Sequence, residues 1–325
     1  SADGKLQVDR GDKLVARYRD PSDDFGNVAN EISTSFYGLT VINGGSLLGN
    51  TTWNTSGSPY LLTGDITVPN TVTLTIESGV EVRFTPLTDD LSSGEDVNRI
   101  ELIIEGVLRV KGAQSDTVTF MSNGQVPASG DWYGIVSTGS TGKVLMDYAS
   151  INHYTNGIRI KSGSSDYTDY NNDDTVSVAN TKFYGGGSAI YGDGYSYRPI
   201  IFTYNKLYEC GVYDRSYTSY KSYENNRIVS QVSYKTLDVG YVRTGSSSNT
   251  FSSATLKVNS NTFDKGHIYI YYLRLYEGNG SNTISVEVKN NYLSRGSQGI
   301  SLEYLRNYTS NRKRFNLDID NNTVF

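Results

Sequence analysis

The stretch LKVNSNTFDKG, from Leu256 to Gly266, decides the fold because its pattern returns twice further along the chain. VEVKNNYLSRG, from Val286 to Gly296, and LDIDNNTVF, from Leu317 to Phe325, repeat it. In each copy a strand-like alternation of apolar residues leads into a central Asn, and the second residue after that Asn is apolar again. Asn is a poor strand former, so its return to this place in a β-type pattern requires a structural reason.

We name this central position the Asn slot. Asn fills the slot five times, as Asn205, Asn226, Asn261, Asn291 and Asn322. The same frame holds Thr181 and Ala149 further upstream, and successive slots lie 21–35 residues apart. Self-similarity at such a period is typical of a solenoid, in which each repeat stacks on the last.

Each repeat contains three short strands. One strand precedes the slot, as in ISVEV at 284–288, and one follows it directly. The third begins at a small residue and alternates apolar positions, as in GISL at 299–302. A leucine-rich repeat would need a Leu ladder and a helical segment, and a propeller blade would need four strands. We therefore predict an all-β chain that forms a right-handed parallel β-helix of about ten coils, stacked about 4.8 Å apart.

This fold gives the Asn slots a structural interpretation. A coil turns sharply between its sheets, and Asn tolerates the left-handed backbone conformation that such a bend requires. Equivalent side chains of stacked coils lie above one another, so Asn amides can hydrogen-bond along the stack. We expect the slots to be interior bend residues with a structural role.

The repeat is looser in the first half of the chain. LTIESGVEVRF, from Leu74 to Phe84, and LIIEGVLRVKG, from Leu102 to Gly112, share a strand–Gly–strand layout. The polar run 86–98 between them is typical of an inserted loop. We therefore predict that the β-helix spans residues 45–325.

Residues 1–44 differ from the repeats. LQVDRGDKLVARYRD, from Leu6 to Asp20, predicts a β-hairpin with its polar turn at Asp9–Asp12. Such a segment could cap the first coil, since an open end of a solenoid exposes unpaired backbone. It could also be the remnant of a preceding domain, or pair with another chain by strand addition.

Composition excludes several classes of function. The net charge is −5 with both signs well mixed, so nothing indicates a nucleic-acid partner. The lone Cys210 excludes an internal disulfide and a cysteine-based metal site. No apolar run has the ~18 residues of a membrane span.

The run SPYLLTGDITVPNTVTLTIESGVEVRF, from Ser58 to Phe84, resembles the opening coils of secreted bacterial proteins of the parallel β-helix superfamily. GDWYGI, from Gly130 to Ile135, and the Asn-slot coils resemble the same group. The resemblance covers residues 45–325 and implies a pectate-lyase-like fold at an extracellular or cell-surface location. The superfamily includes polysaccharide lyases, polygalacturonases, adhesins and structural surface proteins, and the fold does not choose among them.

Fragments of the polygalacturonase motifs occur, but they do not form a catalytic set. Arg159-Ile160-Lys161 precedes Asp173-Asp174 where the motif order requires the reverse, and Gly266-His267 is followed by Ile268. An inverting hydrolase needs two carboxylates about 6.5–9.5 Å apart on one surface, which this order does not provide. We interpret Arg159 as a solvated charge on a strand and assign no catalytic residue.

Acidic clusters in loops are the candidates for a metal site. Ca²⁺ prefers several hard oxygen ligands, and the best such group is Asp166, Asp169, Asp173 and Asp174. None of the acidic runs follows an EF-hand or nonapeptide pattern. We therefore predict no obligatory cofactor and keep Ca²⁺ as an alternative to solvated loops.

Tyrosine is the least ordinary part of the composition, with 27 residues. Tyrosines on equivalent positions of stacked coils would form a ladder on one face, able to bind a sugar or a second subunit. The candidate residues for this face are Tyr213, Tyr217, Tyr220, Tyr223, Tyr269, Tyr271 and Tyr272. Packing between coils within the molecule is the alternative.

Three functions are therefore open. The first is a non-catalytic structural rod that self-associates as a cell-surface, adhesin or filament subunit. The second is a carbohydrate-binding module that uses exposed tyrosines. The third is a polysaccharide lyase or glycoside hydrolase, for which the sequence provides no complete catalytic set.

Overall fold

The structure of the chain is a computed structural model. It describes residues 13–19, 28–35, 38–138, 141–161, 175–194, 198–229, 236–242, 253–275, 283–294, 299–307 and 314–325. Within these ranges the regular elements are strands, and three parallel sheets make up most of them.

We number the three parallel sheets in the order in which the chain visits them. Sheet I consists of β3 (Thr40–Ile42), β6 (Tyr60–Leu62), β9 (Glu81–Phe84), β12 (Val118–Ser122), β15 (Ala149–Asn152), β18 (Lys182–Tyr184), β21 (Lys206–Tyr208), β24 (Arg227–Val229), β27 (Thr262–Asp264), β30 (Tyr292–Ser294) and β33 (Thr323–Val324). Sheet II consists of β4 (Gly45–Ser46), β7 (Ile66–Val68), β10 (Glu101–Ile104), β13 (Trp132–Ser137), β16 (Tyr154–Ile160), β19 (Ser188–Gly194), β22 (Gly211–Ser216), β25 (Leu237–Gly240), β28 (His267–Leu275) and β31 (Gly299–Asn307). Sheet III consists of β5 (Thr51–Trp53), β8 (Thr73–Glu77), β11 (Val107–Lys111), β14 (Lys143–Asp147), β17 (Val176–Ala179), β20 (Ile200–Thr203), β23 (Tyr220–Glu224), β26 (Ser253–Asn259), β29 (Thr283–Lys289) and β32 (Arg314–Asp320).

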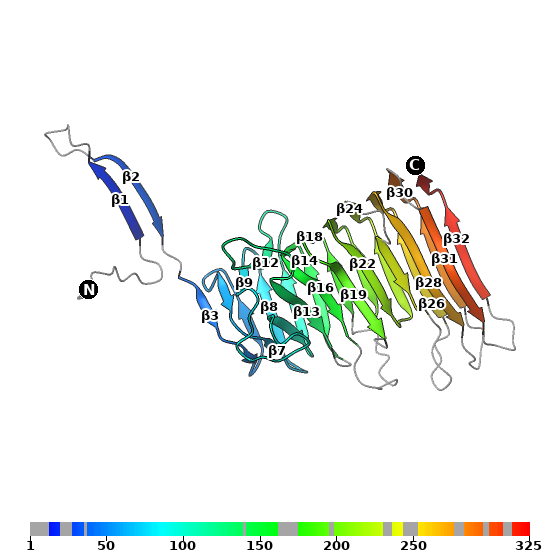
Figure 1. The fold of residues 1–325 in the computed structure, drawn as a ribbon, viewed down its shortest axis with the longest axis horizontal. Helices are drawn as coiled ribbons and strands as arrows, with labels where there is room; N and C mark the ends of the chain where they lie inside the picture. The colour runs from blue at the N-terminus through cyan, green and yellow to red at the C-terminus, as the bar shows by residue number, and fades with distance from the viewer. Residues whose placement is uncertain are drawn as a thin grey trace.

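The chain passes through sheets I, II and III in turn and then returns to sheet I one coil further along. Every strand of these sheets pairs in parallel with the strand three positions away in chain order, as in β21 with β24. Figure 1 shows the resulting rod, coloured blue to red along its axis. The prediction of a right-handed parallel β-helix of about ten coils is confirmed.

The interior of the rod is filled by the inward side chains of all three sheets. Alternation along each strand sends every second residue inward, as in β26, where Leu256 and Val258 are fully buried. Aromatic rings stack between coils, with Phe84 and Trp132 at 3.8 Å between centroids and 3° between planes. Burying an apolar side chain of this size contributes about 1.5–3 kcal/mol, so the interior supplies the main driving force for folding.

The five Asn slots form one continuous hydrogen-bonded ladder between sheets III and I. Each Asn Oδ1 accepts the backbone N–H of the preceding slot, as from Asn205 to Asn226 and from Asn226 to Asn261, both at 2.9 Å. Each Nδ2 donates to a carbonyl of the preceding coil, as from Asn261 to Tyr223 at 2.8 Å. The buried amides are therefore satisfied by the neighbouring coil.

The prediction that the slot residue itself takes the left-handed backbone conformation is wrong. The left-handed conformation belongs to the residue before the slot, with φ of 58° at Asn225 and 57° at Ser260. Tyr204 also takes this place at 58°, so the bend accepts a bulky side chain. The slot Asn is selected by the hydrogen bonds of its side chain and not by tolerance of positive φ.

The N-terminal hairpin exists but pairs differently from the prediction. β1 (Lys13–Arg19) pairs in an antiparallel manner with β2 (Val28–Ser35), and the strand expected before Asp9 lies outside the described residues. β2 has the sequence VANEISTS, which is a weak strand signal because it is mostly polar. The first strand of the solenoid, β3, begins at Thr40, ahead of the predicted boundary at 45.

Candidate functional site

The outer face of sheet II carries aromatic and charged side chains at equivalent positions of consecutive coils. Strand register places Arg159, Tyr191, Tyr213, Asp238, Tyr269 and Ser301 in one column. Beside it, Asp193 pairs with Arg215 and Tyr271 pairs with Glu303. We name these residues the tyrosine–arginine strip.

The members of the strip bind one another. The guanidinium of Arg215 lies 4.9 Å from the ring centroid of Tyr213 and 4.3 Å from that of Tyr271. It also donates two hydrogen bonds to Asp238, at 3.2 and 2.9 Å. Tyr191 and Tyr213 stack at 5.0 Å with 22° between planes. The flat faces of these rings are therefore covered by neighbours within the strip, which leaves their edges outward.

The strip continues toward the C-terminus through hydrogen bonds. The Tyr269 hydroxyl donates to Glu303, and His267 Nε2 lies 2.6 Å from the hydroxyl oxygen of Ser301. Burial and the hydrogen bond to Glu303 raise the pKa of Tyr269. This phenol therefore stays neutral and cannot act as a base near neutral pH.

The predicted tyrosines divide among four environments. Tyr213, Tyr269 and Tyr271 belong to the strip, and Tyr217 and Tyr272 both contact Tyr241, at 4.5 and 5.2 Å between centroids. Tyr220 lies on the outer side of sheet III, half-buried. Tyr223 is fully buried and its hydroxyl donates to Asp214, so its assignment to a binding face is wrong. An odd separation of three residues places Tyr220 and Tyr223 on opposite faces of β23.

The interior contains a buried ion pair that sequence reasoning missed. Lys221 Nζ lies 2.9 Å from Asp214 Oδ2 and donates to the carbonyl of Gly240 at 2.8 Å. Both side chains are fully buried, and burial lowers the pKa of Lys221 against the attraction of Asp214. The frame of the Asn slot did contain a signal, since Lys221 stands five residues before Asn226, as Leu256 does before Asn261.

A second charged cluster holds the inserted loop 86–98 against sheet II. Glu95 of the loop accepts from Tyr133 at 2.6 Å and lies 3.2 Å from Arg159 Nε and 3.0 Å from Lys161 Nζ. Arg159 also binds Asp193 at 2.9 Å and is largely buried, so the interpretation of Arg159 as a solvated charge is wrong. The loop covers the guanidinium, which the sequence alone could not show.

The electrostatics of this cluster favour binding over acid–base chemistry. Burial alone would raise the pKa of Glu95, but hydrogen bonds from Tyr133 and Lys161 and the charge of Arg159 hold it below its ordinary value. Burial and the same carboxylate raise the pKa of Tyr133. Glu95 is thus an ionised anchor, and the phenol beside it is a poor base.

Three buried carboxylates fix the two ends of the same loop. Asp89 accepts the backbone N–H groups of Asp65 and Ser93, and Asp65 accepts that of Glu101 at 2.6 Å. Glu101 Oε1 accepts the N–H groups of Glu95 and Asp96, both at 2.8 Å. Burial raises the pKa of Glu101 to about 7. Asp65, Asp89 and Glu101 therefore bind backbone N–H groups at the two ends of the loop.

The predicted metal ligands cannot be placed. Asp166, Asp169, Asp173 and Asp174 lie outside the described residues. Within the part of the chain that the structure describes, no group of three or more His, Cys, Asp and Glu side chains is arranged to hold a metal ion. In the same part of the chain no helix is long and apolar enough to cross a membrane.

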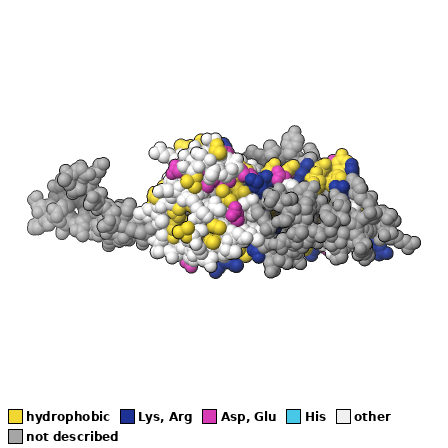
Figure 2. All heavy atoms as spheres, turned by 90° about the horizontal axis from the view of Figure 1, so that it is seen from below, with side chains coloured by type: hydrophobic (Ala, Val, Ile, Leu, Met, Phe, Trp, Pro, Cys, Tyr) yellow, Lys and Arg dark blue, Asp and Glu magenta, His cyan; other side chains and the backbone are white. Residues whose placement is uncertain are grey.

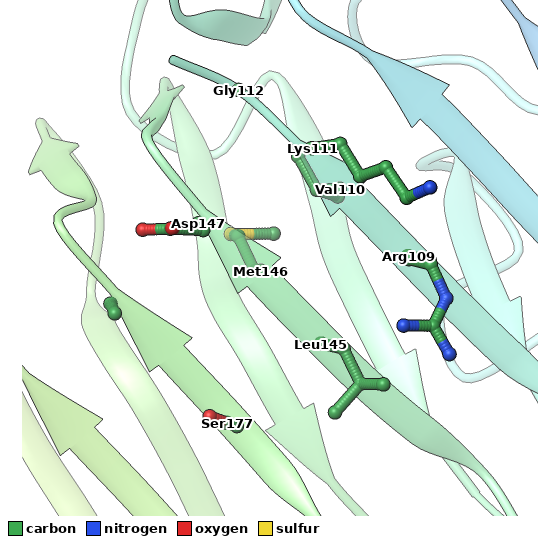
Figure 3. Close-up of a pocket in the computed structure, with 9 residues that line it drawn as sticks. Arg109, Val110, Lys111, Gly112, Leu145, Met146, Asp147 and Ser177 are labelled. Atoms are coloured by element: carbon green, nitrogen blue, oxygen red, sulfur yellow. The ribbon is translucent and has the colours of Figure 1, made fainter. Parts of the chain in front are cut away.

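Two shallow depressions lie on the outer faces of the other sheets. Figure 3 shows the first, on sheet III, where Arg109 and Lys111 of β11 lie beside Leu145 and Asp147 of β14, in a volume of about 400 Å³. The second, of about 460 Å³, lies on sheet I and is lined by Arg227, Thr262, Asp264, Tyr292, Ser294 and Phe325. Elsewhere, Figure 2 shows one side of the rod on which acidic, basic and hydrophobic side chains are interspersed.

Comparison with known proteins identifies the fold and no activity. Residues 45–177 match the family model of a pectate-lyase-like β-helix domain. The matched segment includes β4 to β16 and the cluster of Tyr133, Arg159 and Lys161. No curated protein and no solved structure matches the chain.

Proposed function

We propose that the chain is a non-catalytic structural rod of the cell surface or the extracellular space, acting as an adhesin or filament subunit. The observation that carries this proposal is the tyrosine–arginine strip, in which Arg215 joins Tyr213, Asp238 and Tyr271 of three consecutive coils. Side chains that bind each other across coils stiffen a rod, because they add contacts between repeats that otherwise meet only through backbone and core.

The same geometry argues against the tyrosines of the strip as a sugar-binding platform. A sugar ring stacks on the flat face of an aromatic ring. Tyr191 and Tyr213 cover each other's faces, and Arg215 lies over Tyr213 and Tyr271. The rings contribute to cohesion of the rod.

Self-association is the part of this proposal that involves a partner. The β1–β2 hairpin has only two strands, and an isolated two-stranded hairpin is marginally stable in water. Its outer edges could therefore accept a strand from a second copy of the chain. Electron microscopy of the purified chain at rising concentration should show assemblies, and particles that stay monomeric throughout would contradict the role as a filament subunit.

A second candidate function rests on one specific observation. Arg159, Lys161 and Tyr133 gather on the outer face of sheet II, inside the segment that matches the pectate-lyase-like model. Cationic side chains beside carboxylates could neutralise and deprotonate an acidic sugar in a β-elimination. All three are bound to Glu95, so a substrate would have to displace the loop first.

The two functions give opposite results in one assay. The chain is incubated with acidic polysaccharides, and the unsaturated sugar product of β-elimination is followed by its ultraviolet absorbance. A structural rod yields no product, and a Glu95→Gln variant with a loosened loop yields none either. Product formed by the chain and lost in Lys161→Ala, with Lys257→Ala as the control, would replace the structural proposal by the enzymatic one.

A further inference from the structure

The outer face of sheet I carries three cations in one vertical column. Lys182, Lys206 and Arg227 are the first residues of β18, β21 and β24, and strand register pairs each directly with the next. All three side chains are exposed. None of them forms an ion pair with another residue that the structure describes.

This column has no explanation in the stability of the rod. Like charges directly opposite each other on paired strands destabilise a sheet. Elsewhere the outer faces pair opposite charges across coils, as Lys289 with Asp318 on sheet III. On sheet I the column continues from Ser150 before Lys182 to Thr262 after Arg227, so no carboxylate flanks the three cations within it.

The column leads directly into the depression of about 460 Å³ on the same face. Arg227 lines both, and Thr262 and Tyr292 continue its column on the next two coils. Thr262 and Ser294 place hydroxyl groups there, and Asp264 has the one acidic side chain among its lining residues. These polar groups are the kind that bind sugar hydroxyls.

Tyr292 differs from the other tyrosines of sheet I. Tyr184 and Tyr208 stack face to face at 4.5 Å with 4° between planes, which covers the face that each ring turns to the other. Tyr292 is 44% exposed, and its nearest ring, that of Phe325, is tilted by 53° at 5.7 Å. Because the two rings are tilted, Phe325 does not cover the face of the Tyr292 ring, so Tyr292 can stack on a sugar ring.

We propose that the outer face of sheet I from β18 to β30 binds a linear anionic polysaccharide that runs along the rod. Acidic groups of the polymer bind Lys182, Lys206 and Arg227, and a sugar ring lies on Tyr292 above the hydroxyls of Thr262 and Ser294. Cations that recur at each strand spacing of about 4.8 Å match a polymer whose charges recur regularly. This binding goes beyond a structural role and does not depend on it.

The experiment compares two variants that remove the same charge from different faces. One is Lys182→Gln/Lys206→Gln/Arg227→Gln on sheet I. The matched control is Arg109→Gln/Lys111→Gln/Lys257→Gln, which removes three cations from the outer face of sheet III, two of them in its own depression. The probes are a carboxylated polyuronate, a sulfated glycan, a neutral glucan and single-stranded DNA, measured by isothermal titration calorimetry at several salt concentrations.

The chain should bind one of the two acidic glycans and not the glucan. The glycan that binds shows whether the recognised acidic group is a carboxylate or a sulfate. The sheet I variant should lose at least tenfold in affinity and reduce the salt slope by about three, one for each lost contact. The control should stay within twofold. Tyr292→Ala should lose several-fold with an unchanged salt slope, because it removes stacking and no charge.

Three outcomes would overturn the proposal. They are no binding to either acidic glycan, an equal loss in both triple variants, and DNA binding as tight as glycan binding. Because the exposed substitutions leave the core intact, urea unfolding of each variant shows whether a loss of binding is a loss of fold. These outcomes leave the structural proposal untouched, since that one is tested by assembly.

Discussion

Asn226 and Asn261 are joined across two consecutive coils by a single acceptor oxygen. Asn261 Oδ1 accepts the backbone N–H of Asn226 at 2.9 Å and its side-chain amide at 3.0 Å. Asn261 relates in the same way to Asn291, at 3.0 Å for both bonds. The bends of the last coils are therefore held by one chain of amides.

Removal of one side-chain amide from this ladder should destabilise the folded protein strongly. Asn261→Ala leaves the buried N–H of Asn226 and the carbonyl of Tyr223 without a partner. Each unsatisfied group costs about 1–3 kcal/mol, so the free energy of unfolding should fall by about 2–5 kcal/mol. Urea unfolding measures this, with the exposed Asn98→Ala as a control that should change it by less than about 0.5 kcal/mol. Equal effects in the two variants would contradict the ladder.

The buried ion pair should respond differently to the loss of one partner and of both charges. Lys221→Met leaves Asp214 ionisable in the interior, held only by Ser216 and Tyr223, and should cost about 3–5 kcal/mol. Lys221→Met/Asp214→Asn removes both charges and should recover part of that loss. The outward neighbour Lys257→Met is the control. A double variant less stable than the single one would show that the charge of Asp214 is not the cause.

Stability should fall as pH rises from about 4.5 to about 7. Burial raises the pKa of Glu101 from 4.5 to about 7, so the folded chain binds a proton that the unfolded chain has released in this interval. Burial raises the pKa of Asp65 as well, which adds in the same direction. Glu101 alone should lower the free energy of unfolding by about 3 kcal/mol over this interval.

Glu101→Gln tests this pH dependence directly. The amide keeps the acceptor for the N–H groups of Glu95 and Asp96 and cannot ionise. The variant should lose most of the decrease in stability between pH 5 and 8 and should be the more stable chain at pH 8. Parallel stability curves for the two chains would assign the pH dependence to other groups.

Arg215 should act through its geometry as well as its charge. Arg215→Ala removes the partner of Asp238, which is 2% exposed, and should cost about 2–4 kcal/mol. Arg215→Lys keeps the charge but loses the two hydrogen bonds to Asp238 and the stacking on Tyr213 and Tyr271. It should therefore recover only part of the stability that Arg215→Ala loses. The near-ultraviolet circular dichroism of the tyrosines should change in both. Full rescue by Lys would show that charge alone matters.

Sequence periodicity predicted the coils because each strand obeys a local rule. The alternation of Leu256 and Val258 before Asn261, and its repetition at Val286 and Asn291, contains all that a stacked coil needs. The same alternation places Tyr223 inside, so the grouping of Tyr223 with Tyr220 by Tyr content is wrong. Lys221 also has an inward position, but its charge is typical of a surface residue, so composition gives no sign of its burial.

The candidate sites depended on neighbours from distant parts of the chain. Arg159 is covered by Glu95 of the inserted loop. The local sequence around Arg159 and around Glu95 does not predict this contact. The cation column of Lys182, Lys206 and Arg227 needs the register between coils, which only the pairing of strands provides.

The sequence by itself determined that this chain winds into a parallel β-helix, because strand alternation and the slot amides are properties of a few adjacent residues repeated along it. The tertiary structure decided which outward side chains meet. Stacking brings residues 20 to 38 positions apart into contact, as Thr40 with Tyr60 and Glu81 with Thr119. Insertions of different length between strands set that register, so charge ladders, stacked rings and the loop that covers Arg159 exist only in the assembled rod.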